Sequence, residues 1–142
     1  MDLDDIDRPL NQRGLRDAPD MGRRLFERSL IPDIIVSSPA VRARATAQAV
    51  ANAVRYGNDI IIDEELYGAE PPDVLEIVSD FRDQWQTAMV VGHNPTMTQL
   101  ANRFSDTSIE NVPTCGVLVV QTTQWSCVDQ ARLLDFDYPK KP

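Results

Sequence analysis

Two short segments of this 142-residue chain combine residue types that could bind a phosphate group. The first is Ser37-Ser38-Pro39-Ala40-Val41-Arg42, and the second is Gly92-His93-Asn94-Pro95, which holds the only histidine of the chain. Arginine offers a planar fork of donors that matches phosphate oxygens, and histidine can stabilise the charge of a phosphoryl-transfer transition state. A structural role competes in each case. His93 could be a hydrogen-bonded structural histidine, and Arg42 a solvated arginine in a first helical turn.

Each segment follows an apolar run, at 33–38 and at 89–91, that is typical of a strand buried on both faces of a parallel sheet. We expect a helix after each strand, with Ser38 as N-cap and Pro39 in the first position of one helix. Pro95 should take the first position of the other.

If the two strands are parallel neighbours, both junctions lie at the same edge of the sheet. Arg42 would then face His93 across a crevice floored by two helix N-termini, which favour anions. We therefore predict Arg42 and His93 as the catalytic residues of a phosphate pocket. Arg8 lies in a loop that could reach the crevice and is a further candidate for substrate contact, with an exposed loop arginine as the competing interpretation. Asn94 is another candidate for substrate contact.

The remaining periodicity predicts alternating strands and helices followed by a hairpin. This pattern indicates an α/β fold with three layers (α/β/α) and a mixed, mostly parallel sheet, in one domain over residues 1–142. Helices are expected from about residue 17 to 30, from 39 to 56, from 71 and from 95; strands are expected at 33–38, 59–63, 89–91, 117–121 and 131–136. The apolar stripes are expected at Leu15, Ala18, Gly22, Leu25 and Phe26, at Val41, Ala45, Ala49 and Ala53 with Val50 and Val54, at Val74, Leu75, Val78, Phe81 and Trp85, and at Met97, Leu100, Ala101 and Phe104.

Composition narrows the classes of partner. The net charge of −8 argues against nucleic acid and anionic membranes, since phosphate backbones require clustered Lys and Arg. No apolar run reaches the length of a membrane span, and the acidic N-terminus is unlike a signal peptide, so a cytoplasmic location is expected. Cys115 and Cys127 are predicted to be free thiols, and no metal or other cofactor is expected.

Other polar groups are weaker candidates for chemistry. A carboxylate of the run at 63–65 could act as a general acid, although a solvated turn is the competing interpretation. Glu65 and Tyr67 lie where a proton donor would be sought. Cys115 has no second histidine to activate it as a nucleophile.

Several motifs follow one another along the chain: Arg8-Pro9-Leu10, then Arg13-Gly14, then Ser37-Ser38-Pro39-Ala40-Val41-Arg42-Ala43 with Thr46, and finally Val91-Gly92-His93-Asn94-Pro95. Their order resembles the histidine phosphatase superfamily, and more closely its SixA-type phosphohistidine phosphatases. The resemblance implies a phosphoglycerate mutase-like fold and metal-free phosphoryl transfer through a phosphohistidine. It also implies that Arg42 binds phosphate and that His93 is the second, supporting histidine.

The family's nucleophilic histidine follows a first strand, in an Arg-His-Gly or Arg-His-Ala motif, and residues 1–7 resemble the acidic loop after that motif. The chain is therefore expected to be truncated at its N-terminus and nearly inactive. Either the natural protein is longer, or the chain is complete and non-catalytic. We favour the first, because losing a strand of about 5–6 residues from mid-sheet exposes apolar surface and open edges. That cost is hard to meet from a stability of about 5–15 kcal/mol.

The expected function is hydrolysis of a phosphohistidine protein or a small phosphomonoester. The alternatives are a non-catalytic module that binds a phosphorylated ligand through Arg42 and His93, and a structural α/β domain whose site is a relic.

Overall fold

Strand β1 (Ile34–Ser37) is the centre of a three-stranded parallel sheet with the order β2-β1-β3, where β2 is Ile61–Ile62 and β3 is Ala88–Val91. This computed structural model describes residues 3–142, so the first two residues of the predicted acidic loop lie outside it. All four residues of β1 are buried. The interpretation of this run as a doubly buried strand is therefore confirmed.

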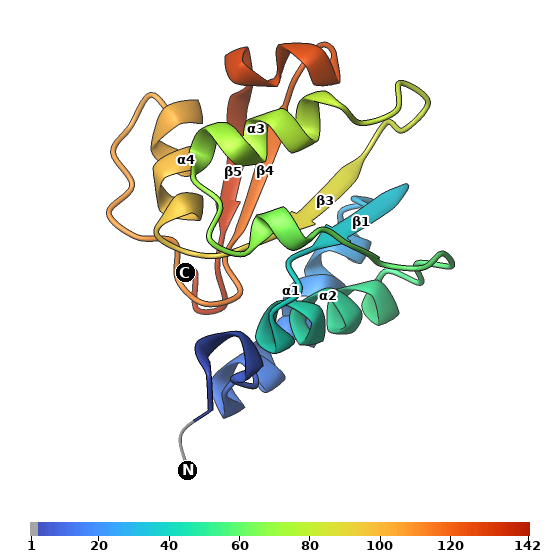
Figure 1. Cartoon of the computed structure of the whole chain (residues 1–142), viewed down its shortest axis with the longest axis vertical. Helices are drawn as coiled ribbons and strands as arrows, with labels where there is room; N and C mark the ends of the chain where they lie inside the picture. Colours follow the sequence, from blue (N-terminus) through green and yellow to red (C-terminus); the bar gives the residue numbers. More distant parts are fainter. Residues whose placement is uncertain (1–2) are drawn as a thin grey trace.

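Successive side chains of β1 enter two different cores, as the alternation of a strand requires. Ile34 and Val36 pack with buried residues beside and within α3 (Pro71–Ser79) and α4 (Thr96–Phe104). Ile35 packs instead on α2 (Val41–Ala53). Helix α1 (Gln12–Glu27) lies against α2, so α1 and α2 cover one face and α3 and α4 the other (Figure 1). The predicted layers are confirmed.

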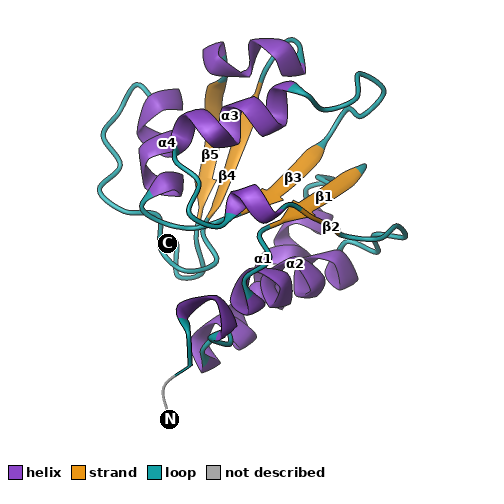
Figure 2. Cartoon of the chain, in the orientation of Figure 1, coloured by secondary structure: helices purple, strands orange, loops and turns teal. Residues whose placement is uncertain are grey.

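The two remaining strands form a separate antiparallel pair. Strands β4 (Val117–Gln121) and β5 (Arg132–Asp137) pair with an irregularity between Val119 and Val120, and η3 (Trp125–Gln130) connects them. The predicted hairpin is thus confirmed. Within residues 3–142, no strand pairs with β3 on the edge away from β1, or with β4 on the edge away from β5 (Figure 2). The strands are therefore divided between two sheets.

The start of α1 was predicted too late in the chain. The helix begins at Gln12 because the Asn11 side chain accepts a hydrogen bond from the Gly14 N–H, at 2.9 Å, and so caps it. Pro19 consequently lies inside the helix and not in its first turn. Leu15, expected in the apolar stripe, is 60% exposed.

Helix α2 also differs from its prediction. Its N-cap is Ala40 and not Ser38, and its first residue is Val41 and not Pro39. The expected stripe was right for Val50 and Val54, which are buried, and wrong for Val41 and its three alanines, because alanines occur on several sides of this helix. Its buried face consists of Ala43, Ala47, Val50 and Ala51.

Pro95 is the N-cap of α4 rather than its first helical residue. Two short 3-10 helices are also present: η1 (Asp5–Asp7), within the predicted N-terminal loop, and η2 (Glu64–Leu66). The predicted apolar face after Pro71 packs on the core of β1, including Phe81 and Trp85, which lie beyond the end of α3. None of the helices in residues 3–142 is long and apolar enough to span a membrane.

Candidate functional site

Arg42 and His93 line the same pocket, as the parallel arrangement of their strands predicts. Ser37 at the end of β1 lies opposite Val91 at the end of β3, so the segments that follow leave the sheet at the same edge. The pocket has a volume of about 580 Å³ and is lined by Asp5, Arg42, Tyr67, Gly68, Ala69, Glu70, Pro71, His93, Asn94, Pro95, Thr96 and Gln99.

The Arg42 guanidinium is held by Asp5 of η1. It donates to the Asp5 backbone oxygen at 2.8 Å and to the Asp5 carboxylate at 3.1 Å. The Tyr67 hydroxyl donates to the same carboxylate oxygen at 2.6 Å. These bonds, first that from Tyr67 and then that from Arg42, lower the pKa of Asp5, and the same contact raises the pKa of Tyr67. A carboxylate thus occupies donors that match a phosphate group.

His93 lies between a buried serine and an aromatic ring. Its Nε2 is 2.7 Å from the Ser38 Oγ, and its ring meets that of Tyr67 edge to face, with centroids 5.6 Å apart. Burial lowers the pKa of His93, and the positive charge of Arg42 lowers it further, while Asp5 acts in the opposite direction. The imidazole is therefore more often neutral at neutral pH than a solvated histidine is.

Asn94 lines the pocket, but its side chain has a structural task. Its amide group donates to the Val112 oxygen at 2.6 Å and accepts from the Thr98 N–H at 3.0 Å, which joins the start of α4 to the segment before β4. Substrate contact by Asn94 stays a prediction.

Arg8 is exposed and is not among the residues that line the pocket. It is close enough for its charge to lower the pKa of Asp5. A role for Arg8 in binding substrate also stays a prediction.

Sequence reasoning missed several residues of the pocket. Asp5 and Glu70 bring carboxylates to it, and Thr96 and Gln99 bring polar groups from α4. Glu70 is the N-cap of α3, and its N–H bonds to the Asp73 carboxylate at 2.9 Å. The acid three residues after Glu70 was a capping signal in the sequence. No local sequence pattern predicts that Asp5 contacts Arg42, because the two residues are 37 positions apart in the chain.

Of the two candidates for a proton donor, Glu65 does not line the pocket, whereas Tyr67 does.

Cys115 is half-buried, and burial raises the pKa of its thiol to about 11, which leaves it a poor nucleophile. Both cysteines are free in the part of the chain that is described. Residues 3–142 contain no group of three or more His, Cys, Asp or Glu side chains that could hold a metal ion.

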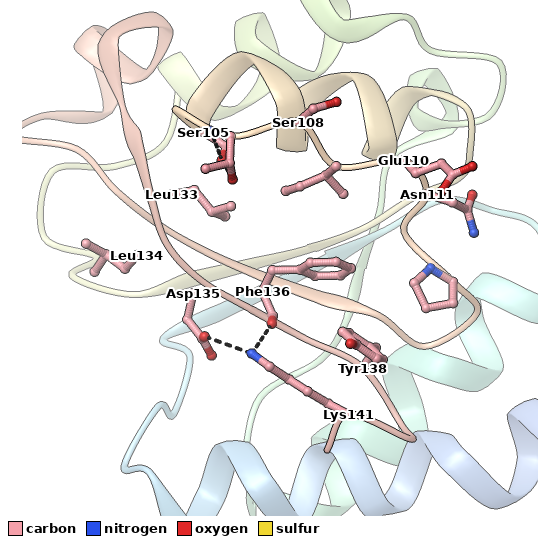
Figure 3. Close-up of a pocket in the computed structure, with 13 residues that line it drawn as sticks. Ser105, Ser108, Glu110, Asn111, Leu133, Leu134, Asp135, Phe136, Tyr138 and Lys141 are labelled. Carbon is pink, nitrogen blue, oxygen red and sulfur yellow. Dashed lines mark hydrogen bonds and ion pairs between the residues drawn. The ribbon is translucent and has the colours of Figure 1, made fainter.

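A second hollow, of about 690 Å³, lies between β5, the segment after α4 and the C-terminal residues (Figure 3). Leu133, Phe136 and Tyr138 form part of its apolar wall, and the ammonium group of Lys141 lies 3.4 Å from the Asp135 carboxylate at its rim. It is larger than the pocket of Arg42 and His93. Its lining contains neither an arginine nor a histidine, and the Lys141 ammonium group is paired with Asp135, so we favour the smaller pocket as the candidate site.

Comparison with known proteins gives related sequences and structures. Residues 4–69 match the model of the histidine phosphatase superfamily (branch 1). An uncharacterised protein of Mycobacterium tuberculosis is 33% identical over 151 residues, which cover 96% of this chain and 92% of the relative. One of Mycobacterium leprae is 30% identical over 152 residues, covering 96% and 89% of the two chains.

Among solved structures, the SixA protein of Agrobacterium tumefaciens, assigned as a phosphohistidine phosphatase, is 32% identical with a TM-score of 0.80. The alignment covers 96% of this chain and 87% of that one. The SixA protein of Nakamurella multipartitia, with the same assignment, is 27% identical with a TM-score of 0.79, over 99% and 90% of the two chains.

Proposed function

The chain belongs to the histidine phosphatase superfamily, in its SixA-type branch, and we propose that its pocket binds the phosphoryl group of a phosphohistidine protein or a small phosphomonoester for hydrolysis. One observation carries this proposal: the Arg42 guanidinium and the His93 imidazole line one pocket at the carboxyl edge of β1 and β3. A cation with a planar fork of donors and a neighbouring imidazole suit the oxygens of a phosphoryl group.

In this proposal Arg42 binds two non-bridging oxygens, and His93 donates a hydrogen bond to a third. Both stabilise the negative charge that spreads over these oxygens during transfer. The Asp5 carboxylate has to leave Arg42 or share it, because the phosphoryl oxygens need the same guanidinium donors. Binding therefore replaces the Asp5 carboxylate, wholly or in part, by the phosphoryl group as the anion that Arg42 contacts.

The single histidine limits what this chain does by itself. The family's reaction proceeds through a covalent phosphohistidine, and the resemblance assigns His93 the supporting role. We expect the 142-residue chain to bind phosphate and to turn substrate over slowly or not at all. This expectation favours a second candidate function, a non-catalytic phosphate-binding module.

Phosphate binding is tested with Arg42→Ala. Titration of the 142-residue chain with inorganic phosphate, followed by calorimetry or by the NMR signals of His93, should show at least a tenfold loss of affinity in this variant. The matched control is Arg44→Ala. Arg44 lies on the same helix, is exposed and does not line the pocket, and within residues 3–142 its side chain donates only to the Pro39 oxygen, at 3.0 Å. Undiminished binding by Arg42→Ala would refute the assignment of the pocket.

Turnover separates the two candidate functions. The 142-residue chain and a form extended at its N-terminus by the residues encoded in frame upstream are compared on an aryl phosphate and a phosphohistidine peptide. Hydrolysis by the longer form alone supports the enzyme. Equal hydrolysis by both would refute the need for another histidine, and binding without hydrolysis in both favours the module. An immediate in-frame stop codon upstream would exclude an extended enzyme.

A further inference from the structure

Two adjacent serines, Ser37 and Ser38, are completely buried at the end of β1 and use their hydroxyls differently. The Ser37 hydroxyl donates to the Ser38 backbone oxygen at 2.9 Å and has no contact with the pocket. The Ser38 Oγ lies 2.7 Å from His93 Nε2 and accepts the Ala40 N–H at 3.2 Å. Only Ser38 therefore connects the first strand-to-helix junction with the histidine of the second.

The direction of the bond between Ser38 and His93 follows from the hydrogen bonds of the hydroxyl group. A serine hydroxyl has one proton to donate, and the Oγ already accepts from Ala40. If Nε2–H donated to this oxygen, the hydroxyl proton would have no other acceptor among residues 3–142, in a position without access to water. Buried donors are almost always paired. The arrangement that satisfies every group has the Ser38 hydroxyl donating to an unprotonated Nε2.

This direction determines which ring nitrogen of a neutral His93 carries the proton. A neutral imidazole has one N–H and one acceptor nitrogen, so an accepting Nε2 requires the proton on Nδ1. No hydrogen bond reaches Nδ1 from the described part of the chain, and the His93 ring lines the pocket. Nδ1–H is thus the polar group of the ring that remains for a ligand.

We propose that Ser38 is a positioning residue, which holds His93 in the Nδ1–H tautomer so that the neutral imidazole donates a hydrogen bond to a phosphoryl oxygen. The second half of this statement rests on the proposed function; the first half does not. The tautomer gives an uncharged His93 a donor for the phosphoryl group. Without the Ser38 hydroxyl, the ring is free to adopt the Nε2–H form that free histidine prefers, and it can then present an acceptor to an anion.

The test uses the single histidine, because every imidazole signal in an NMR spectrum of the 142-residue chain belongs to His93. Long-range proton–nitrogen correlation of protein labelled with ¹⁵N-histidine, recorded at pH 8 without phosphate, should show a protonated Nδ1 and an unprotonated Nε2. Ser38→Ala should move the populations toward Nε2–H, and Ser38→Thr, which keeps the hydroxyl, should restore Nδ1–H.

Ser37→Ala is the matched control, since it removes an equally buried hydroxyl that does not touch His93. It should leave the tautomer unchanged. A wild-type spectrum with the proton on Nε2, or an unchanged tautomer in folded Ser38→Ala, would overturn the role of Ser38. The wild-type spectrum by itself shows which nitrogen of His93 carries the proton. The proposal can therefore be refuted even if Ser38→Ala does not fold.

Addition of inorganic phosphate then separates this inference from the proposed function. A downfield shift of Nδ1–H in the wild-type protein, together with about tenfold weaker binding by Ser38→Ala and recovery in Ser38→Thr, supports both. The correct tautomer without any effect of phosphate would refute the proposed function and the use of the donor, and would leave the Ser38–His93 assignment standing.

Discussion

Strands β1 and β3 lie side by side in one sheet and differ in burial, although both are apolar runs. Ile35 pairs with Met89, and Val36 pairs with Val90. Every residue of β1 is buried, whereas every residue of β3 is partly exposed. The difference arises because β1 has a strand on each edge, while β3 has one only on the β1 side among the described residues. Apolar composition indicates that a strand can be buried; its neighbours decide whether it is.

The same difference separates the two main residues of the pocket. Arg42 follows the enclosed strand and is fixed by an ion pair with Asp5. His93 follows the more exposed strand and is held through Ser38, which belongs to the enclosed side. The exposed half of the site therefore depends on the enclosed half for its geometry.

The largest expected effect compares Ile35→Ala with Met89→Ala, two paired positions that contribute to one core cluster. Ile35 is 0% exposed, so its truncation should lower the free energy of unfolding by about 3–4 kcal/mol, whereas truncation of the partly exposed Met89 should lower it by about 1–2 kcal/mol. Urea unfolding of both variants measures the difference. Equal losses would mean that the two strands are enclosed to the same degree.

On the side of Arg42, Asp5→Asn should strengthen binding of inorganic phosphate several-fold, because it removes the anion that competes for the guanidinium. Its lowered pKa keeps the Asp5 carboxylate charged above its ordinary value of 3.8, so the gain should persist across neutral pH. Asp7→Asn is the control, since Asp7 belongs to the same short helix and does not line the pocket. Weaker or unchanged binding by Asp5→Asn, measured by calorimetry, would argue against competition.

On the side of His93, the pH dependence has a defined sign. The pKa of His93 in the folded protein is below its ordinary value of 6.5, so the unfolded chain binds more protons between these two values. The contribution of His93 to stability is therefore complete above pH 6.5 and is lost as the pH falls through the folded pKa. An NMR titration of His93 should give a midpoint below 6.5, which bound phosphate raises. A midpoint at or above 6.5 in the free protein would contradict its burial.

The smallest effect concerns Cys115, which precedes β4 of the second sheet and whose thiol lies 3.9 Å from the Gly14 backbone oxygen. With a pKa of about 11, only about one thiol in a thousand is ionised at pH 8, so alkylation by iodoacetamide should be far slower than that of a solvated cysteine peptide. Mass spectrometry of the labelled peptides gives the rate. Rapid labelling of Cys115 would mean that the segment before β4 opens readily and exposes the thiol.

Local signals in the sequence predicted most elements and misplaced the starts of three helices, α1, α2 and, by one residue, α4. Pro19 suggested a late start of α1, but the Asn11 side chain outweighs that signal by capping the helix at Gln12. Ser38 was assigned as an N-cap from its place before Pro39. Its hydroxyl instead forms hydrogen bonds with the Ala40 N–H and with His93, and α2 begins at Val41. A local rule cannot include a partner 55 residues away.

The sequence by itself determined the alternation of strands and helices, and it placed Arg42 and His93 after two parallel strands. Those features depend on residues close together in the chain, through periodicity, turns and capping. Only the tertiary structure decided that Asp5 pairs with Arg42, that Ser38 bonds to His93, and that β1 is enclosed while β3 is not. Each of these depends on contacts between distant segments, and their geometry exists only once the sheet and its helices have packed.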